Sequence, residues 1–127
     1  MNIIDETDRQ ILRTLQRDAT TSLEALAEQL SVSVNTCWRR VRRLEDSGVL
    51  KARVAICDPE PLGLGQTVFV AVRTRDHSAK WLKEFAKTVT AIPEVVEFYR
   101  MAGDVDYLLK IAVGSVADYD RVYKSLI

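Results

Sequence analysis

The segment between residues 33 and 43 carries the side chains best suited to chemistry in this sequence. It contains four arginines and no aspartate or glutamate, whereas the whole chain balances 18 basic against 18 acidic residues. Guanidinium groups pair with phosphates and with guanine edges, so this local surplus indicates binding to nucleic acid. A run of charge is more often a solvated helix face, and the arginines alone leave both interpretations open.

A helix is expected to display these arginines, because the apolar residues of the segment recur at helical spacing. Cys37, Val41 and Leu44 form the core line, Ser33 is a suitable N-cap and Gly48 a suitable stop. At 100° per residue, the opposite face collects side chains that can contact DNA. These are Asn35, Thr36, Arg39, Arg42 and Arg43.

The predicted contacts divide by position along the helix. Ser33, Asn35 and Thr36 lie at its start, which enters the major groove in helix-turn-helix proteins, so we assign them to base edges. The arginines of this face, Arg39, Arg42 and Arg43, are assigned mainly to backbone phosphates.

Two further residues flank the core line of this helix. For Arg40 we expect an ion pair with Glu45 or with another acid of the domain, and for Trp38 we expect packing. Phosphate would repel Glu45 and Asp46, so the DNA face should end by about Arg43.

Two short helices precede the arginine-rich helix. An apolar stripe with acids near its start, where the helix dipole favours them, predicts the first helix over residues 5–18. The second is predicted over residues 23–30, with Thr21 or Ser22 as N-cap and a capping box between Thr21 and Glu24. Only a few residues then lead into the third helix, as in a helix-turn-helix motif.

A strand is predicted after the third helix. Alternation over residues 49–58 places Lys51 and Arg53 outward on this strand, which we interpret as the DNA-contacting wing of a winged helix-turn-helix. Two nearby prolines then break regular structure and indicate a boundary. We therefore assign residues 1–57 to a winged helix-turn-helix DNA-binding domain and residues 58–64 to a linker.

The remaining residues, 65–127, alternate strand and helix patterns and give the chain an α+β fold class. The order strand, helix, strand, strand, helix is that of a ferredoxin-like βαββα(β) domain without its last strand. We interpret this domain as truncated, unless a partner supplies the missing strand. The expected elements cover residues 67–74, 78–91, 95–101, 107–113 and 116 onward.

Both faces of the predicted sheet carry apolar residues. Phe69 and Ala71 alternate with valines in one strand, and Leu108 and Ala112 alternate with larger apolar residues in another. Two helices can cover only one face, so we expect the other to meet a second copy in a homodimer. A dimer would also place two recognition helices about one DNA turn apart.

The turn between the last two strands is a second candidate site. Asp104 and Asp106, flanked by Gly103 and Tyr107, could hold the ammonium group of an amino acid while backbone N–H groups bind its carboxylate. The alternative is a hairpin turn in which aspartate accepts hydrogen bonds from backbone amides, and the spacing alone favours that alternative.

Three segments resemble the Lrp/AsnC, or feast/famine, family of transcriptional regulators, and they occur in that family's order. They read DETDRQIL at residues 5–12, CWRRVRRLEDSGVL at 37–50 and GDVDYLL at 103–109. The resemblance implies a winged DNA-binding domain, a ferredoxin-like domain that dimerises and often forms octamers, and amino-acid effectors bound near the turn. Ser31 and Val34 depart from the family, where glycine and proline are common, and so does the missing last strand.

Other classes of protein lack their signatures in this chain. No apolar run approaches the ~20 residues of a membrane span and no signal peptide is recognisable, so we expect a cytoplasmic, nucleoid-associated protein that makes no membrane contact. Cys37, Cys57 and His77 lie far apart, which indicates no metal, no cofactor and two reduced, buried thiols. Without a nucleophile motif or a phosphate-binding loop, we expect no enzyme.

Two alternatives stay open at this point. Siroheme decarboxylases resemble these regulators in fold, and tetrapyrrole binding would favour that class of enzyme. An architectural protein without an effector would bind random DNA as well as its own upstream region, because phosphate contacts alone would dominate.

Overall fold

The structure, a computed structural model, describes residues 3–127 of the chain and contains two compact units, Met1–Ile56 and Cys57–Ile127. Each unit has its own hydrophobic core. None of the helices in the described residues has the length and apolar character that crossing a bilayer requires.

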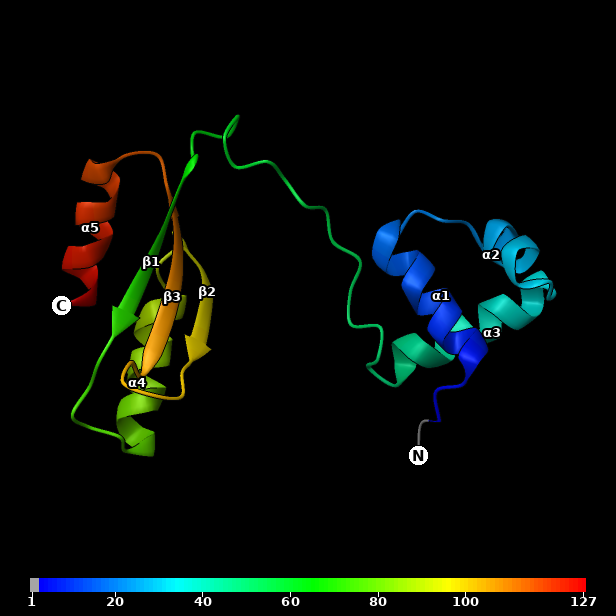
Figure 1. Cartoon of the computed structure of the whole chain (residues 1–127), viewed down its shortest axis with the longest axis horizontal. Coiled ribbons are helices and arrows are strands. Elements are labelled where there is room, and N and C mark those ends of the chain that lie inside the picture. Colours follow the sequence, from blue (N-terminus) through cyan, green and yellow to red (C-terminus); the bar gives the residue numbers. More distant parts are fainter. Residues whose placement is uncertain (1–2) are drawn as a thin grey trace. The chain divides into compact units, whose positions relative to one another are not determined.

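Three helices form the N-terminal unit, as predicted. They are α1 (Glu6–Arg17), α2 (Leu23–Leu30) and α3 (Val34–Asp46), with a short turn between α2 and α3 (Figure 1). Ser31 takes the left-handed conformation in this turn, at φ 55°. The helices enclose a core of Ile11, Leu15, Leu26, Ala27, Cys37, Val41 and Leu44.

The capping box of this unit belongs to α1 and not to α2. Asp8 N donates to the Asp5 carboxylate at 2.8 Å, and Asp5 N donates to the Asp8 carboxylate at 3.2 Å. Helix α2 is capped by Ser22, while the hydroxyl of Thr21 donates to the carbonyl oxygen of Asp18 at 2.8 Å. The prediction of a box between Thr21 and Glu24 is therefore wrong.

The predicted wing strand over residues 49–58 is absent from the described structure of this unit. Leu50 N donates to Leu44 O at 3.0 Å, and residues 51–58 then run without regular structure. A strand needs a partner for its backbone groups, and the described residues of this unit contain no second strand. Alternation in the sequence was therefore a misleading signal here, and Val54 and Ile56 are exposed.

The C-terminal unit has the predicted order of strands and helices. Its three strands form an antiparallel sheet in the order β1-β3-β2 (Figure 1). This is the ferredoxin-like arrangement without a fourth strand. The elements are β1 (Gln66–Val72), α4 (Ala79–Thr90), β2 (Val95–Arg100), β3 (Tyr107–Val113) and α5 (Val116–Leu126).

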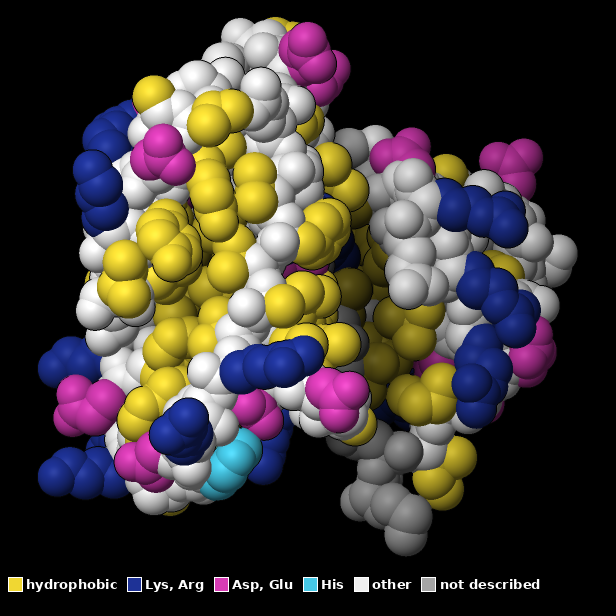
Figure 2. All heavy atoms as spheres, turned by 60° about the vertical axis from the view of Figure 1, so that its left-hand side comes forward, with side chains coloured by type: hydrophobic (Ala, Val, Ile, Leu, Met, Phe, Trp, Pro, Cys, Tyr) yellow, Lys and Arg dark blue, Asp and Glu magenta, His cyan; other side chains and the backbone are white. Residues whose placement is uncertain are grey.

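One face of this sheet packs against both helices. Leu109 and Ile111 of the central strand are fully buried, together with Val89 of α4 and Val122 of α5. The other face is uncovered in the single chain, and hydrophobic side chains gather on the surface of this unit (Figure 2). The large exposed side chains that β1 and β2 contribute to this open face are Phe69, Val96 and Tyr99.

The two cysteines lie in different environments. Cys37 is buried in the helical core, and burial raises the pKa of its thiol. Cys57 is exposed, so the prediction of two buried thiols is wrong for Cys57. Both cysteines are free.

Candidate nucleic-acid interface

The buried and exposed faces of helix α3 are those that the sequence periodicity predicts. Cys37, Val41 and Leu44 are buried, whereas Asn35 and Arg39 on the far side are exposed. In the described part of the chain Arg39 makes no ion pair. This leaves both side chains available to a large external partner.

The first turn of α3 is fixed by its N-cap. Ser33 Oγ accepts from Thr36 N at 3.0 Å and lies 2.8 Å from Thr36 Oγ1. The Ser33 hydroxyl therefore already has two partners, whereas Asn35 has no side-chain hydrogen bond among the described residues. Of the three residues assigned to base edges, Asn35 is the most available.

Two arginines of α3 contact acids at the start of α1. Arg43 Nη2 donates to Asp8 Oδ2 at 2.5 Å, and Arg40 Nη1 donates to Asp8 Oδ1 at 3.1 Å and to Asp5 Oδ2 at 2.6 Å. The expected partner of Arg40 is thus another acid of the domain and not Glu45. Arg43, which was assigned mainly to phosphate, also has this internal partner.

The acids of this cluster differ in burial. The Asp8 side chain is fully buried, and a carboxylate in that position requires paired donors on both oxygens. Asp5 is partly exposed, and the hydrogen bond from Arg40 is the main cause that lowers its pKa to about 2. The contact from Arg40 therefore holds the Asp5 carboxylate in the ionised form, and Asp8 has a guanidinium donor on each of its oxygens.

Arg40 and Arg43 remain partly open to solvent despite these contacts. The Arg43 side chain is 52% exposed and that of Arg40 is 28% exposed. Together with two neighbours they line an open hollow of about 250 Å³. We name it the arginine hollow, and its lining residues are Thr36, Arg39, Arg40 and Arg43.

The other cations predicted to contact DNA are less available for that contact than Arg39. Arg42 lies 3.5 Å from Asp46, and Arg53 lies 3.3 Å from Glu45, so two acids at the end of α3 partly neutralise them. Lys51 is exposed, and it lies in a segment without regular secondary structure. Trp38 is 52% exposed, so the packing expected for it covers only about half of its surface.

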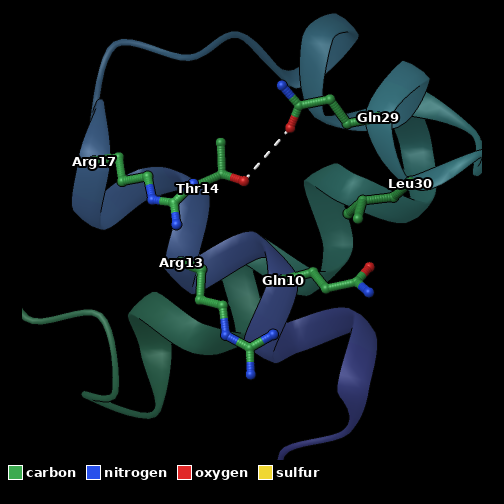
Figure 3. Close-up of a pocket in the computed structure, with 6 residues that line it drawn as sticks. All are labelled: Gln10, Arg13, Thr14, Arg17, Gln29 and Leu30. Carbon is green, nitrogen blue, oxygen red and sulfur yellow. Dashed lines mark hydrogen bonds between the residues drawn. The ribbon is translucent and has the colours of Figure 1, made fainter.

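A second polar hollow lies between α1 and α2 and was not singled out from the sequence. Figure 3 shows Arg13 and Arg17 along one face of α1, and Thr14 Oγ1 donating to Gln29 Oε1 at 3.4 Å. Gln10 and Leu30 complete the lining. The spacing of Gln10, Arg13, Thr14 and Arg17 is that of one helix face, and this polar stripe was the available signal.

The turn at residues 103–107 is organised around its second aspartate. Asp106 Oδ2 accepts from Thr74 N at 2.8 Å, and Asp106 N donates to Val72 O at 3.0 Å. His77 Nδ1 lies 3.9 Å from the other oxygen of this carboxylate. Asp106 therefore ties the turn to the end of β1, as in the hairpin alternative.

The other members of this predicted site are divided between surface and core. Gly103, at φ 112°, and Asp104 are exposed. Tyr107 is buried, in contact with the rings of Trp81, Phe85 and Phe98. Asp104 is thus the acid of the turn that a small molecule can reach from solvent.

Comparison with family models agrees with the two units seen here. Residues 4–51 match a model described as winged helix-turn-helix DNA-binding, and residues 67–127 match the Lrp/AsnC ligand binding domain. Together with the arginine-bearing face of α3, these matches define a DNA-binding transcriptional regulator with a ligand-binding domain.

Individual relatives place the chain within one family. A glutamate uptake regulatory protein of Zymomonas mobilis is 52% identical over 124 residues, covering 98% of this chain and 76% of the relative. The DNA-binding transcriptional activator DecR of Escherichia coli is 46% identical, covering 98% and 82%. The chain belongs to the Lrp/AsnC family of transcriptional regulators.

Solved structures show the same fold. An AsnC family transcriptional regulator from Agrobacterium tumefaciens has a TM-score of 0.91 and 50% identity, covering 97% of this chain and 80% of that one. A transcriptional regulator from Neisseria meningitidis, solved as a complex with L-Met, has a TM-score of 0.88 and 30% identity, covering 95% and 78%.

Proposed function

We propose that this regulator reads DNA with the exposed face of α3. Asn35 and Thr36 contact base edges, with Ser33 fixing the helix start, and Arg39 is the principal phosphate contact. Arg42, Arg43, Lys51 and Arg53 add weaker phosphate contacts, because three of them also pair with acids of the unit. The observation that carries this assignment is that Arg39 is exposed and has no ion-pair partner within residues 3–127, beside a capped helix start free of acids.

Binding measured by fluorescence anisotropy tests this assignment. The duplexes are the DNA upstream of the protein's own gene and a random sequence of equal length. Arg39→Ala should weaken binding to both and lower the slope of log K against log salt by about one. Lys87→Ala, which removes a cation from α4, is the control and should behave like the parent. Equal binding by parent and Arg39→Ala would contradict the assignment.

We also infer that a small amino acid binds near the turn at residues 103–107. Support comes from the match to a ligand-binding domain and from the Neisseria relative crystallised with L-Met. Asp104 supplies a carboxylate for the ammonium group, Gly103 leaves the backbone accessible, and Asp106 and Tyr107 hold the turn in place.

Calorimetric titration with a panel of amino acids tests the effector site. At least one should bind, and Asp104→Ala should abolish its binding while the fold is kept. Glu94→Ala is the matched control, because it removes an acid from the residue that precedes β2. If no amino acid binds or changes DNA affinity, and random DNA binds as well as the upstream region, the architectural alternative is favoured.

Assembly is the third part of the proposal. The open face of the sheet, with Phe69, Val96 and Tyr99, is the surface we assign to a homodimer, from which octamers can form. Sedimentation velocity over a range of concentrations should show a dimer or larger species at micromolar protein. A monomer at all concentrations would contradict this assignment.

We further propose that the protein is not an enzyme and that it acts at the nucleoid in the cytoplasm. Its relatives are named as regulators, and DNA is where such a protein acts. His77, the single histidine, is exposed beside Asp106 and lines none of the hollows described above. Absorption spectra after incubation with siroheme test the enzyme alternative, and tetrapyrrole binding would favour it.

A further inference from the structure

The arginine hollow has an unusual neighbour for a DNA-binding surface. Directly behind Arg43 lies the carboxylate of Asp8, which is fully buried, while Arg43 itself is half exposed. Each Asp8 oxygen accepts from one guanidinium group of α3. The contact joins residues 35 positions apart in sequence, at the point where α1 meets α3.

Simple charge counting makes these acids unfavourable for DNA binding. The hollow contains three arginines, and Asp5 and Asp8 cancel two of those charges, which leaves a net charge of +1. Phosphate attraction depends on uncompensated positive charge, so the same surface without the acids would attract DNA more strongly. If their role concerns DNA, it must be geometric.

A geometric role follows from the chemistry of the guanidinium group. Arginine has five N–H donors in a rigid plane, and only some of them are used by the Asp8 and Asp5 carboxylates. One bond holds Arg43 to Asp8 and two bonds hold Arg40 to Asp8 and Asp5, so these contacts restrict the directions in which the remaining donors can point. Fixing a long side chain beforehand removes an entropy cost that would otherwise be paid on binding.

We propose that the arginine hollow seats one backbone phosphate of bound DNA, and that Asp8, assisted by Asp5, is the positioning residue that orients its guanidinium groups. The proposal rests on the proposed DNA-binding function and deepens it. Arg39 supplies the unpaired charge, Arg43 supplies oriented donors, and the Thr36 hydroxyl can donate at the helix start.

Removing the negative charges of Asp5 and Asp8 tests the proposal, because the two explanations predict opposite changes in DNA affinity. Charge counting predicts that Asp5→Asn and Asp8→Asn tighten DNA binding, whereas the positioning role predicts that each weakens it. Affinity for a random-sequence duplex is measured by anisotropy between low and physiological salt. We expect about tenfold weaker binding and a salt slope reduced by about one.

Glu6→Gln is the matched control for both variants. Glu6 lies at the same end of α1, carries the same charge and pairs with Arg13, outside the hollow. It should leave affinity unchanged or slightly raise it. Arg43→Lys is a further variant that keeps the charge but loses the planar donor fork, and it should also weaken binding.

Folding is checked for each variant by circular dichroism and thermal unfolding. Asp8 is buried, so Asp8→Asn could fail to fold, and Asp5→Asn then decides, because asparagine is as good an N-cap as aspartate. Binding by Asp5→Asn as tight as that of Glu6→Gln, with the parent salt slope, overturns the proposal. In that case, weakened DNA binding by Arg39→Ala would still support the DNA-binding face of α3. If the parent protein binds no DNA, the proposed function itself is refuted.

Discussion

The two units of this protein complete their cores in different ways. In the helical unit, three helices enclose residues such as Ile11, Leu26 and Leu44, each at most 1% exposed. In the sheet unit, helices cover one face, while Phe69 is 60% exposed and Val96 is 53% exposed on the other. The helical unit presents the arginine-bearing face of α3 outward, whereas the sheet unit leaves one apolar face of its sheet uncovered by its own helices. Contact with DNA and contact with another copy are thus assigned to separate surfaces.

The largest expected effect tests whether the sheet unit has a genuine core of its own. Leu109→Ala removes a fully buried side chain from the central strand and should lower the free energy of unfolding by about 3 kcal/mol. Thermal unfolding followed by circular dichroism measures it. Leu62→Ala, at an exposed position of the same unit, is the control. A loss below about 1 kcal/mol would mean that this core is loosely packed.

The next prediction concerns the open face. Phe69→Lys places a cation opposite Lys110, its register partner on β3, and should weaken dimerisation by about 2 kcal/mol. Sedimentation equilibrium measures the change. Thr88→Lys adds the same charge on an exposed position of α4 and should leave the dimer intact. Equal weakening by both substitutions would assign the interface elsewhere.

A smaller effect is expected at the helical unit. Asn35→Ala should reduce discrimination between preferred and random DNA by about 1 to 2 kcal/mol, with little change in the salt slope. Competition binding with the two duplexes measures it. Glu28→Ala, on the exposed side of α2, is the control and should keep the preference. An unchanged preference in Asn35→Ala would remove this residue from the base contacts.

The smallest effect is a pH dependence in the helical unit. The pKa of Asp5 is lowered to about 2, so the ionised carboxylate stabilises the folded state. This contribution is complete above the unfolded value of about 4 and is lost as the pH falls from there toward 2. Acid unfolding of Asp5→Asn should therefore lack part of the decrease that parent and Glu6→Gln show. Identical acid profiles would contradict the lowered pKa.

Local patterns in the sequence were sufficient for most of the fold. Helical spacing and caps predicted α1, α2 and α3, and alternation predicted the three strands, because each signal lies within a few residues. Alternation failed over residues 49–58, since it reports which side chains share a face and not whether a partner strand exists.

Of the candidate site, only the exposed face of α3 could be predicted from the sequence. Periodicity placed Asn35 and Arg39 opposite the core line, where the structure has them. The pairing of Arg40 and Arg43 with Asp5 and Asp8 was not predictable, because it depends on how α1 crosses α3 and joins residues more than 30 positions apart. The acids of α1 were interpreted only through the helix dipole, which was one of their two roles.

The contrast between the two thiols has a practical consequence. Cys37 is buried with a raised pKa, while Cys57 is exposed at the start of the second unit. Alkylating reagents attack accessible thiolates, so a maleimide dye at neutral pH should label Cys57 alone in the folded protein. A single fluorophore can therefore be attached where the two units join in sequence, without mutagenesis.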